Sequence, residues 1–359
     1  MLPRQEIENL KVCPHGGPNY TELEWLGFKP EDMLDFSVSA NPFGPPPEVK
    51  EAITSSVLDR YPDPESSDLR NALATHLNTN PKNIIVGNGS VEIIRLIAAA
   101  FFEKEAPILI VEPTFGEYEI ACRISGSKIL KHRTQESNSF KLNTDEFASF
   151  IQSHRPKAVF LCNPNNPTGQ YLNQKEIEQI LSASEDTLLI LDEAYINFTT
   201  EPQSAIQLID RGNMVIIRSM TKDYALAGLR LGYAIANPEI IDTLKKVCPP
   251  WNVNAVAQSA GAIALSKQDY LNRCKDDILK AKGFLLEKLS ALGLNPLPSK
   301  THFFLVNVGQ ANQFRQKLLR HGIMVRDCTS FGLPEYIRIA PRTMPECEKL
   351  IQSIGEIQK

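Results

Sequence analysis

Lys222 lies in a run of residues whose types suit covalent chemistry with an aldehyde. The run reads Ser219-Met-Thr-Lys222-Asp-Tyr-Ala-Leu-Ala-Gly-Leu-Arg230, and Leu231 and Gly232 follow. A lysine amine in such a setting can condense with an aldehyde to form a Schiff base. The small hydroxyls before Lys222 and the arginine after it are groups that a phosphate ester needs nearby. An aldehyde that is also a phosphate ester describes pyridoxal 5′-phosphate (PLP), so this run predicts that cofactor.

The same run admits a second reading. Ser219-Met-Thr-Lys222 has the S-x-x-K spacing of penicillin-binding acyl-transfer enzymes. That class also carries S-D-N and K-T-G, and neither tripeptide occurs in this chain. The PLP interpretation is therefore favoured.

Asp192 follows an apolar run, in the segment Leu191-Asp-Glu-Ala-Tyr195. In parallel α/β sheets, ligands lie beyond the carboxyl ends of strands. A carboxylate at such a strand end could keep a pyridine nitrogen protonated and turn the ring into an electron sink. Tyr195 could donate a hydrogen bond to a ring oxygen. The alternative is an acidic strand end that caps the next helix.

Three further segments follow expected strands and offer groups to a phosphorylated ring. Gly87-Asn-Gly89-Ser90 would open a helix, where free N–H groups and the helix dipole favour phosphate. Asn166, in a stretch made rigid by two prolines, could hydrogen-bond a ring substituent, and Phe115 could stack on a flat ring. Ordinary turns and a core aromatic residue are the alternatives.

Arg326, Arg338 and Arg342 are close together near the end of the chain. Arg338 is flanked by apolar residues in an expected strand, so its charge should need a partner. Guanidinium groups bind carboxylate and phosphate in a bidentate manner. A structural ion pair could explain any one arginine, whereas three together indicate an anionic substrate.

Short apolar runs alternate with amphipathic stretches between about residues 80 and 236. The expected strands are residues 83–86, 107–111, 127–132, 158–162, 187–191, 214–218 and 231–236. The expected helices between them are residues 91–102, 118–125, 145–153, 174–184 and 205–211. Nearly continuous apolar strands are typical of a sheet covered on both faces, so we expect an α/β fold with a mainly parallel central sheet sandwiched by helices.

The remaining residues follow another pattern. Two long helices are expected at 255–266 and 268–292, and strands near 302–308 and 336–340 flank a helix at 311–321. We therefore expect a large domain over residues 46–250 and a smaller α+β domain built from residues 1–45 and 251–359.

Composition excludes several classes of function. The net charge of −4 gives no basic excess for nucleic acid. The seven cysteines are scattered and form no CxxC pair, so we expect neither a metal site nor a disulfide framework. The chain starts without an apolar leader and has no run long enough to span a membrane, which predicts a cytoplasmic protein with no membrane partner.

Taken in order, these motifs resemble the fold-type I PLP-dependent enzymes of the aspartate aminotransferase superfamily. The resemblance implies that Lys222 joins the cofactor, that Asp192 pairs with the ring nitrogen, and that Tyr195 and Asn166 contact the ring's phenolic oxygen. It implies that Phe115 stacks on the ring. The residues that it places around the phosphate are Gly89, Ser90, Ser219 and Arg230. It also implies a homodimer in which Tyr61, in Arg-Tyr61-Pro-Asp-Pro, reaches the neighbouring subunit's cofactor.

Two branches of the superfamily compete. Histidinol-phosphate aminotransferases share the Arg-Tyr-Pro-Asp and Ala-Leu-Ala-Gly-Leu-Arg stretches. Threonine-phosphate decarboxylases of cobalamin biosynthesis share them too, and also resemble this chain around His15-Gly-Gly and Asn41, and over residues 250–254 and 336–343. These added segments favour the decarboxylase, although Pro18 departs from the asparagine that often follows His-Gly-Gly in that family.

We therefore expect decarboxylation of L-threonine O-3-phosphate to (R)-1-aminopropan-2-ol O-phosphate and CO2. L-Serine O-phosphate decarboxylation, histidinol-phosphate transamination and PLP binding without catalysis are the alternatives. Arg338 is the expected carboxylate ligand, and Arg326, Arg342 and His15 are candidates for the substrate phosphate, with Asn41 beside them. The reaction depends on which bond of the substrate is held perpendicular to the ring, which the sequence does not specify.

Overall fold

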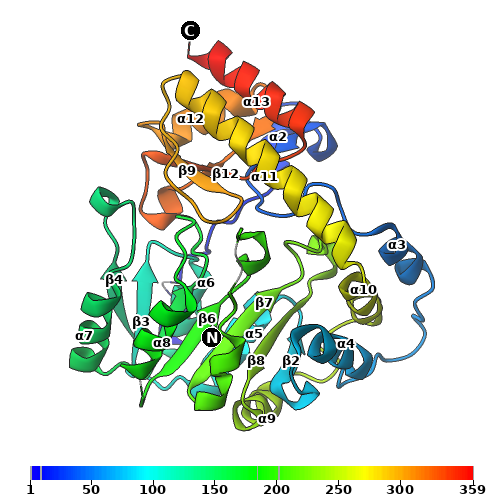
Figure 1. Cartoon of the computed structure of the whole chain (residues 1–359), viewed down its shortest axis with the longest axis vertical. Helices are drawn as coiled ribbons and strands as arrows, with labels where there is room; N and C mark the ends of the chain where they lie inside the picture. The colour runs from blue at the N-terminus through cyan, green and yellow to red at the C-terminus, as the bar shows by residue number, and fades with distance from the viewer. Residues whose placement is uncertain (1, 9, 184, 201–202, 359) are drawn as a thin grey trace.

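A seven-stranded sheet forms the centre of the computed structural model, which describes residues 2–8, 10–183, 185–200 and 203–358 (Figure 1). The strands lie in the order β2 (Ile84–Gly87), β8 (Gly232–Ala236), β7 (Met214–Ser219), β6 (Leu188–Asp192), β5 (Ala158–Cys162), β3 (Pro107–Glu112) and β4 (Lys128–Arg133). Strand β8 alone runs in the opposite direction to the other described strands of this sheet. The predicted α/β class with a mainly parallel sheet is confirmed, and the ends of each strand predicted between residues 83 and 236 lie within one residue of an observed strand.

Apolar side chains leave both faces of this sheet, as the continuous apolar runs predict. Leu109 and Val111 of β3 join one core, whereas Ile108 and Ile110 join the other. The first core is covered by α3 (Pro47–Thr54), α4 (Ser67–Leu77), α7 (Thr144–His154), α8 (Gln174–Ser182) and α10 (Ala255–Leu265). The second core is covered by α5 (Ser90–Phe101), α6 (Glu117–Ser125) and α9 (Pro238–Val247).

The predicted helices agree with these elements apart from their ends and one change of type. The expected end of α8 at Ser184 lies outside the described residues. The segment expected as a helix over 205–211 is a 3-10 helix, η5 (Ile206–Arg211). Ala205, which precedes this helix, donates its N–H to Glu193, and Gly212 ends the helix in the left-handed conformation. The short segment closes i to i+3 bonds, as from Leu208 N–H to the Ala205 carbonyl.

Segments from the N-terminal and C-terminal parts of the chain lie together above the central sheet (Figure 1), although residues 5–8 pack on α6. Strand β1 (Leu34–Asp35) pairs in parallel with β10 (Ile323–Met324), and an antiparallel sheet has the order β11 (Arg326–Asp327), β12 (Tyr336–Ile339), β9 (Phe304–Asn307). Phe36 shares a buried core with the helices α11 (Gln268–Ala291), α12 (Ala311–Leu319) and α13 (Met344–Ile357). Helix α10, in contrast, packs on the central sheet although it follows residue 250. The domain division at residues 45 and 250 stays a prediction, and its outermost positions 1 and 359 lie outside the described residues.

The remaining helices are short. They are α1 (Gln5–Glu8), α2 (Tyr20–Trp25), and the 3-10 helices η1 (Pro30–Asp32), η2 (Pro81–Asn83), η3 (Glu136–Asn138), η4 (Ile196–Phe198), η6 (Ala227–Leu229) and η7 (Thr329–Phe331). Among the described residues, none of the helices has the length and apolar character that a bilayer span requires.

The carboxyl ends of the parallel strands gather the segments that carry the predicted motifs. Strand β2 leads to Ser90, β3 to Phe115, β5 to Asn166, and β7 to Lys222, while Asp192 is the last residue of β6. The sheet therefore brings these five residues to one edge.

Candidate active site

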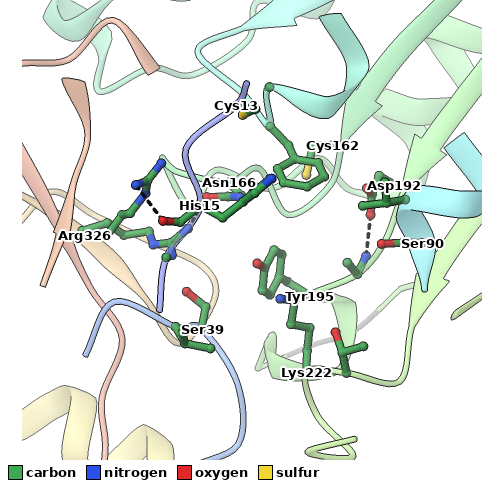
Figure 2. A pocket seen from close by; sticks show the side chains of 18 of the residues that line it. Cys13, His15, Ser39, Ser90, Cys162, Asn166, Asp192, Tyr195, Lys222 and Arg326 are labelled. Atoms are coloured by element: carbon green, nitrogen blue, oxygen red, sulfur yellow. Dashed lines mark hydrogen bonds between the residues drawn. The ribbon is translucent and has the colours of Figure 1, made fainter. Parts of the chain in front are cut away.

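A cavity of about 400 Å³ opens where this edge of the sheet meets the antiparallel sheet. Its walls include most of the predicted site residues, namely His15, Ser90, Phe115, Asn166, Asp192, Tyr195, Lys222, Arg230, Arg326 and Arg338. In Figure 2, Asp192 and Ser90 lie on one side of the view, Arg326 and His15 lie on the other, and Lys222 and Tyr195 lie between them. One cavity thus joins residues from positions 15 to 338 of the chain.

Lys222 presents its amine to the cavity from the segment after β7. Its Nζ atom lies 5.7 Å from the centroid of the Tyr195 ring. Burial, together with the charges of Arg338 and Arg230, lowers the pKa of Lys222 to about 8. Loss of hydration disfavours the charged form of an amine, and neighbouring cations add to the effect. A large fraction of this amine is therefore neutral near pH 8, which is the form that attacks a carbonyl carbon.

Asp192 is buried at the end of β6 and has two hydrogen-bond donors. Tyr118 donates its hydroxyl to Oδ2 at 2.7 Å, and the Ala194 N–H donates to Oδ1 at 2.9 Å. Burial raises the pKa of the Asp192 carboxyl, and these two hydrogen bonds oppose that rise. No cation lies within ion-pair distance of Asp192 among the residues that the structure describes. The carboxylate is thus oriented and desolvated, and it lacks a cationic partner from this part of the chain.

Ser90, Arg230 and Thr221 form a polar end of the cavity. Gly89 precedes α5 with φ +79°, and a β carbon at that position would lie 2.9 Å from Nη2 of Arg230. Only glycine fits this conformation and this close approach without strain. Arg230 donates to the Ala227 carbonyl at 3.1 Å and has no carboxylate within ion-pair distance in the described part of the chain. The free guanidinium and the N–H groups at the start of α5 suit an anion.

Arg338 is the most deeply buried of the arginines at the cavity, with 5% of its surface exposed. It donates to Asn166 Oδ1 and to the Ser37 carbonyl, the latter at 2.7 Å, and its guanidinium carbon lies 5.1 Å from the centroid of the Phe303 ring. No carboxylate pairs with it among the described residues. A buried cation held only by neutral acceptors is poised to bind an anion.

Arg326 and His15 lie together at the other side of the cavity. Arg326 donates to the Pro14 carbonyl at 2.7 Å, to the His15 carbonyl at 3.2 Å and to the Ser330 hydroxyl at 2.7 Å. His15 Nε2 lies 3.1 Å from Glu117 Oε1, and its ring tilts against Phe115 at 5.8 Å. Arg326 therefore fastens the segment that carries His15 beside the cavity.

The structure places five predicted site residues away from the cavity walls. Gly89 and Ser219 lie directly behind them, and the Ser219 hydroxyl contacts Thr221 Oγ1 at 2.8 Å, so Thr221 presents its hydroxyl instead. Asn41 holds the backbone of the lysine, because its backbone N–H donates to the Lys222 carbonyl at 2.8 Å. Arg342 pairs with Glu346 at 2.8 Å, and Tyr61 is 75% exposed.

Contacts within the chain account for three of these placements. Arg342 precedes α13, whose acidic first turn offers Glu346 at i+4, so the guanidinium is neutralised locally. Asn41 is held by a second hydrogen bond to the Asp223 carbonyl at 3.1 Å, and its side chain therefore turns from the cavity. Tyr61 stacks on Trp251, with ring centroids 4.3 Å apart, on an exposed surface of the same chain.

Sequence reasoning missed three functional neighbours. Tyr118 reaches Asp192 from α6, although the two residues are 74 positions apart in the sequence. A tyrosine on the apolar face of an amphipathic helix was the available signal, since a buried hydroxyl needs a partner. Thr221 lies within the run around Lys222, and Glu117 follows Phe115 by two positions, but neither residue gave a separate signal.

The comparisons with known proteins agree with this geometry. Residues 31–354 match the family described as aminotransferase class I and II. The histidinol-phosphate aminotransferase of Methanocaldococcus jannaschii is 33% identical over 99% of this chain and 97% of its own length. A histidinol-phosphate aminotransferase from Sinorhizobium meliloti, solved with pyridoxal 5′-phosphate, superposes with a TM-score of 0.88 at 26% identity, covering 99% of this chain and 96% of the other.

These relatives correct the expected reaction. Eight curated relatives that are 31–35% identical to this chain are all histidinol-phosphate aminotransferases. The L-threonine-O-3-phosphate decarboxylase of Porphyromonas gingivalis is a structural neighbour, with a TM-score of 0.81 at 28% identity over 90% of this chain and 98% of that one. The prediction of a threonine-phosphate decarboxylase is therefore wrong, because the segments that favoured it are short and less specific than the full-length similarity. The chain belongs to the class I and II aminotransferases.

Proposed function

We propose that this protein is a PLP-dependent aminotransferase that takes the amino group of histidinol phosphate and passes it to a 2-oxo acid such as 2-oxoglutarate. The observation that carries the proposal is the convergence on one cavity of Lys222, Asp192 and three arginines that have no carboxylate partner among the described residues. The full-length similarity to histidinol-phosphate aminotransferases supports the choice of substrate.

The cavity fits the cofactor in three respects. Lys222 offers a partly buried amine, Asp192 offers a buried carboxylate without a cationic partner in the described residues, and Gly89 leaves the space that Arg230 fills. When bound, PLP supplies an aldehyde carbon that amines attack and a ring that withdraws electrons from the substrate's Cα. Ser90, Thr221 and Arg230 would hold its phosphate, and Asp192 would face its ring nitrogen.

Lys222 would move the proton that transamination requires. Its pKa of about 8 leaves a usable fraction of neutral amine, which can take a proton from the substrate's Cα. The resulting ammonium would then deliver this proton to the carbon that the cofactor's aldehyde contributes, so that one proton moves from Cα to that carbon. Asn41 holds the Lys222 backbone by its hydrogen bond to the carbonyl, and so fixes the position from which the amine acts.

The arginines must serve two substrates of different charge distribution. Histidinol phosphate carries a phosphate and no carboxylate, whereas 2-oxoglutarate carries two carboxylates. Arg338 and Arg326 both face the cavity, so they can bind the phosphate in one half-reaction and the carboxylates in the other. The imidazole of His15 adds a further polar group beside Arg326.

The protein would act as a homodimer. Tyr61 is exposed and stacks on Trp251, so its hydroxyl is available to a second subunit. The polar end of the cavity at Ser90 and Arg230 is the place where a partner's tyrosine would contact the cofactor phosphate.

The test is incubation of the purified holoenzyme with histidinol phosphate and 2-oxoglutarate, followed by measurement of glutamate. L-Threonine phosphate and L-serine phosphate are supplied in parallel, and released CO2 is measured. Glutamate formed at a steady rate supports the proposal. CO2 release without glutamate would overturn it, and Lys222→Ala should remove the activity in either case.

A further inference from the structure

Three side chains with metal-binding chemistry meet at the mouth of the cavity. Cys13, His15 and Glu117 each offer one donor atom, and these atoms all lie within 4.8 Å of one another. His15 Nε2 and Glu117 Oε1 are already 3.1 Å apart. Cys13 and His15 line the cavity, and Figure 2 shows both on the same N-terminal segment.

The surrounding structure holds these groups in place. The Cys13 sulfur lies so close to Gly116 that a β carbon there would approach it to 2.5 Å and would displace it. Arg95 binds the second oxygen of Glu117 at 2.5 Å, and Arg326 fixes the carbonyls of Pro14 and His15. Partners behind a ligand that orient it are a common property of metal sites.

We propose that Cys13, His15 and Glu117 bind one zinc ion at the mouth of the cavity. Zinc takes sulfur, imidazole nitrogen and carboxylate oxygen at about 2.0–2.3 Å, which places tetrahedral ligand atoms roughly 3.3–3.8 Å apart. Donor atoms that all lie within 4.8 Å of one another reach this range with shifts of about 1 Å. A thiolate and a carboxylate together neutralise the ion, and the soft thiolate selects zinc over magnesium or calcium.

Zinc in this position would restrict access to the cavity. It would fasten the N-terminal segment to the start of α6 and would engage the imidazole of His15, which otherwise faces the cavity. Bound zinc should therefore raise the KM for substrate and leave the cofactor in place. This consequence rests on the proposed aminotransferase function, whereas zinc binding itself does not.

The test compares the untagged, full-length holoenzyme with Cys13→Ser and with Cys248→Ser, a matched control at another partly buried thiol. Each protein is dialysed against a chelator, given zinc chloride, and assayed for bound metal by mass spectrometry and for affinity by competition with a chromophoric chelator. We expect one zinc per chain in the parent and in Cys248→Ser, and at least about tenfold weaker binding in Cys13→Ser. Zinc should also raise the Tm of the parent and of Cys248→Ser, and should leave the Tm of Cys13→Ser unchanged.

Equal zinc affinity in all three proteins, or no stoichiometric zinc in the parent, would overturn the site. The metal-free Tm of Cys13→Ser checks that the variant folds. In an activity assay with added zinc, an unchanged KM in the parent would overturn the restricted access. A protein that binds zinc but shows no transamination at all would overturn the proposed function and support the metal site.

Discussion

Tyr118 donates its hydroxyl to Asp192 at 2.7 Å, and its ring stacks on Phe160 with centroids 4.7 Å apart. The stack fixes the ring, and the ring therefore fixes the direction of the hydrogen bond. This hydrogen bond opposes the rise in the pKa of Asp192 that burial causes. Helix α6 thus helps to keep the carboxylate charged at the place where the ring nitrogen of the cofactor would lie.

Replacing Tyr118 with Phe tests this role. The variant keeps the stack on Phe160 and loses only the donor, so the fold should survive. A hydrogen bond to a charged group contributes about 1.5–3 kcal/mol, and kcat should fall roughly 10- to 100-fold. Steady-state kinetics and the absorption spectrum of the bound cofactor are the measurements. An unchanged kcat would show that Asp192 does not depend on Tyr118.

The agreement between sequence and structure at Asp192 and Lys222 has a local cause. Apolar strands followed by polar or glycine-rich turns are short-range signals, and parallel strands must bring their carboxyl ends to one edge. The directions of the side chains beyond those ends depend on contacts that are distant in the sequence. Ser219 and Thr221 illustrate this, because only the folded backbone shows which hydroxyl faces the cavity.

Most of the contacts that the sequence did not predict join residues that are far apart in the sequence. Tyr118 beside Asp192 and Cys13 beside Glu117 come from segments whose packing no local pattern specifies. The spacing of cysteines alone indicated no metal site, because the other two ligand groups are not cysteines. Arg342 is different, since Glu346 lies four positions after it, and this spacing lets two side chains on a helix form an ion pair, although no helix was predicted there.

Arg338 and Arg342 form a matched pair for testing anion binding. Arg338→Gln removes a buried cation that faces the cavity, and kcat/KM for both substrates should fall by roughly 100-fold or more. Arg342→Gln removes an arginine that pairs with Glu346 away from the cavity, so kcat/KM should remain close to the parent value. Kinetics with each substrate varied in turn would check both. Equal losses in the two variants would contradict the assignment of Arg338.

Gly89 is expected to be essential for holding the cofactor phosphate. In Gly89→Ala the β carbon would meet Arg230 at 2.9 Å in a backbone conformation with φ +79°. Strain of about 1–2 kcal/mol and displacement of the guanidinium should weaken PLP binding at least about tenfold. Gly228→Ala is the control, because no atom lies within 4 Å of a β carbon there. Titration of the cofactor-free proteins with PLP would measure the affinity of each variant. Equal PLP affinities of Gly89→Ala and Gly228→Ala would count against this role of Gly89.

Lys222 should make the stability of the cofactor-free protein depend on pH. Its folded pKa of about 8 lies below the ordinary value of 10.5, so the unfolded state binds more protons between these values. The free energy of unfolding therefore rises as the pH increases from 8 towards 10.5, and the cost of burying the charge is fully present below pH 8. Lys222→Met should raise the Tm of the cofactor-free protein at pH 7 more than at pH 9.5. Lys349→Met, at an exposed position, should show no such difference, and a pH-independent gain in Lys222→Met would contradict the shift.

Tyr61 allows the dimer to be tested by mixing two inactive variants, without a structure of the dimer. If Tyr61 serves the partner's cavity, a site needs Lys222 from one subunit and Tyr61 from the other. Lys222→Ala and Tyr61→Ala proteins, unfolded together and refolded, should then form mixed dimers with one intact site. Half of the dimers are mixed and half of their sites are intact, so the mixture should recover about a quarter of the parent activity. If Tyr61 acted within its own chain, mixing would give only the average of the two variants, because no new combination of intact residues would form.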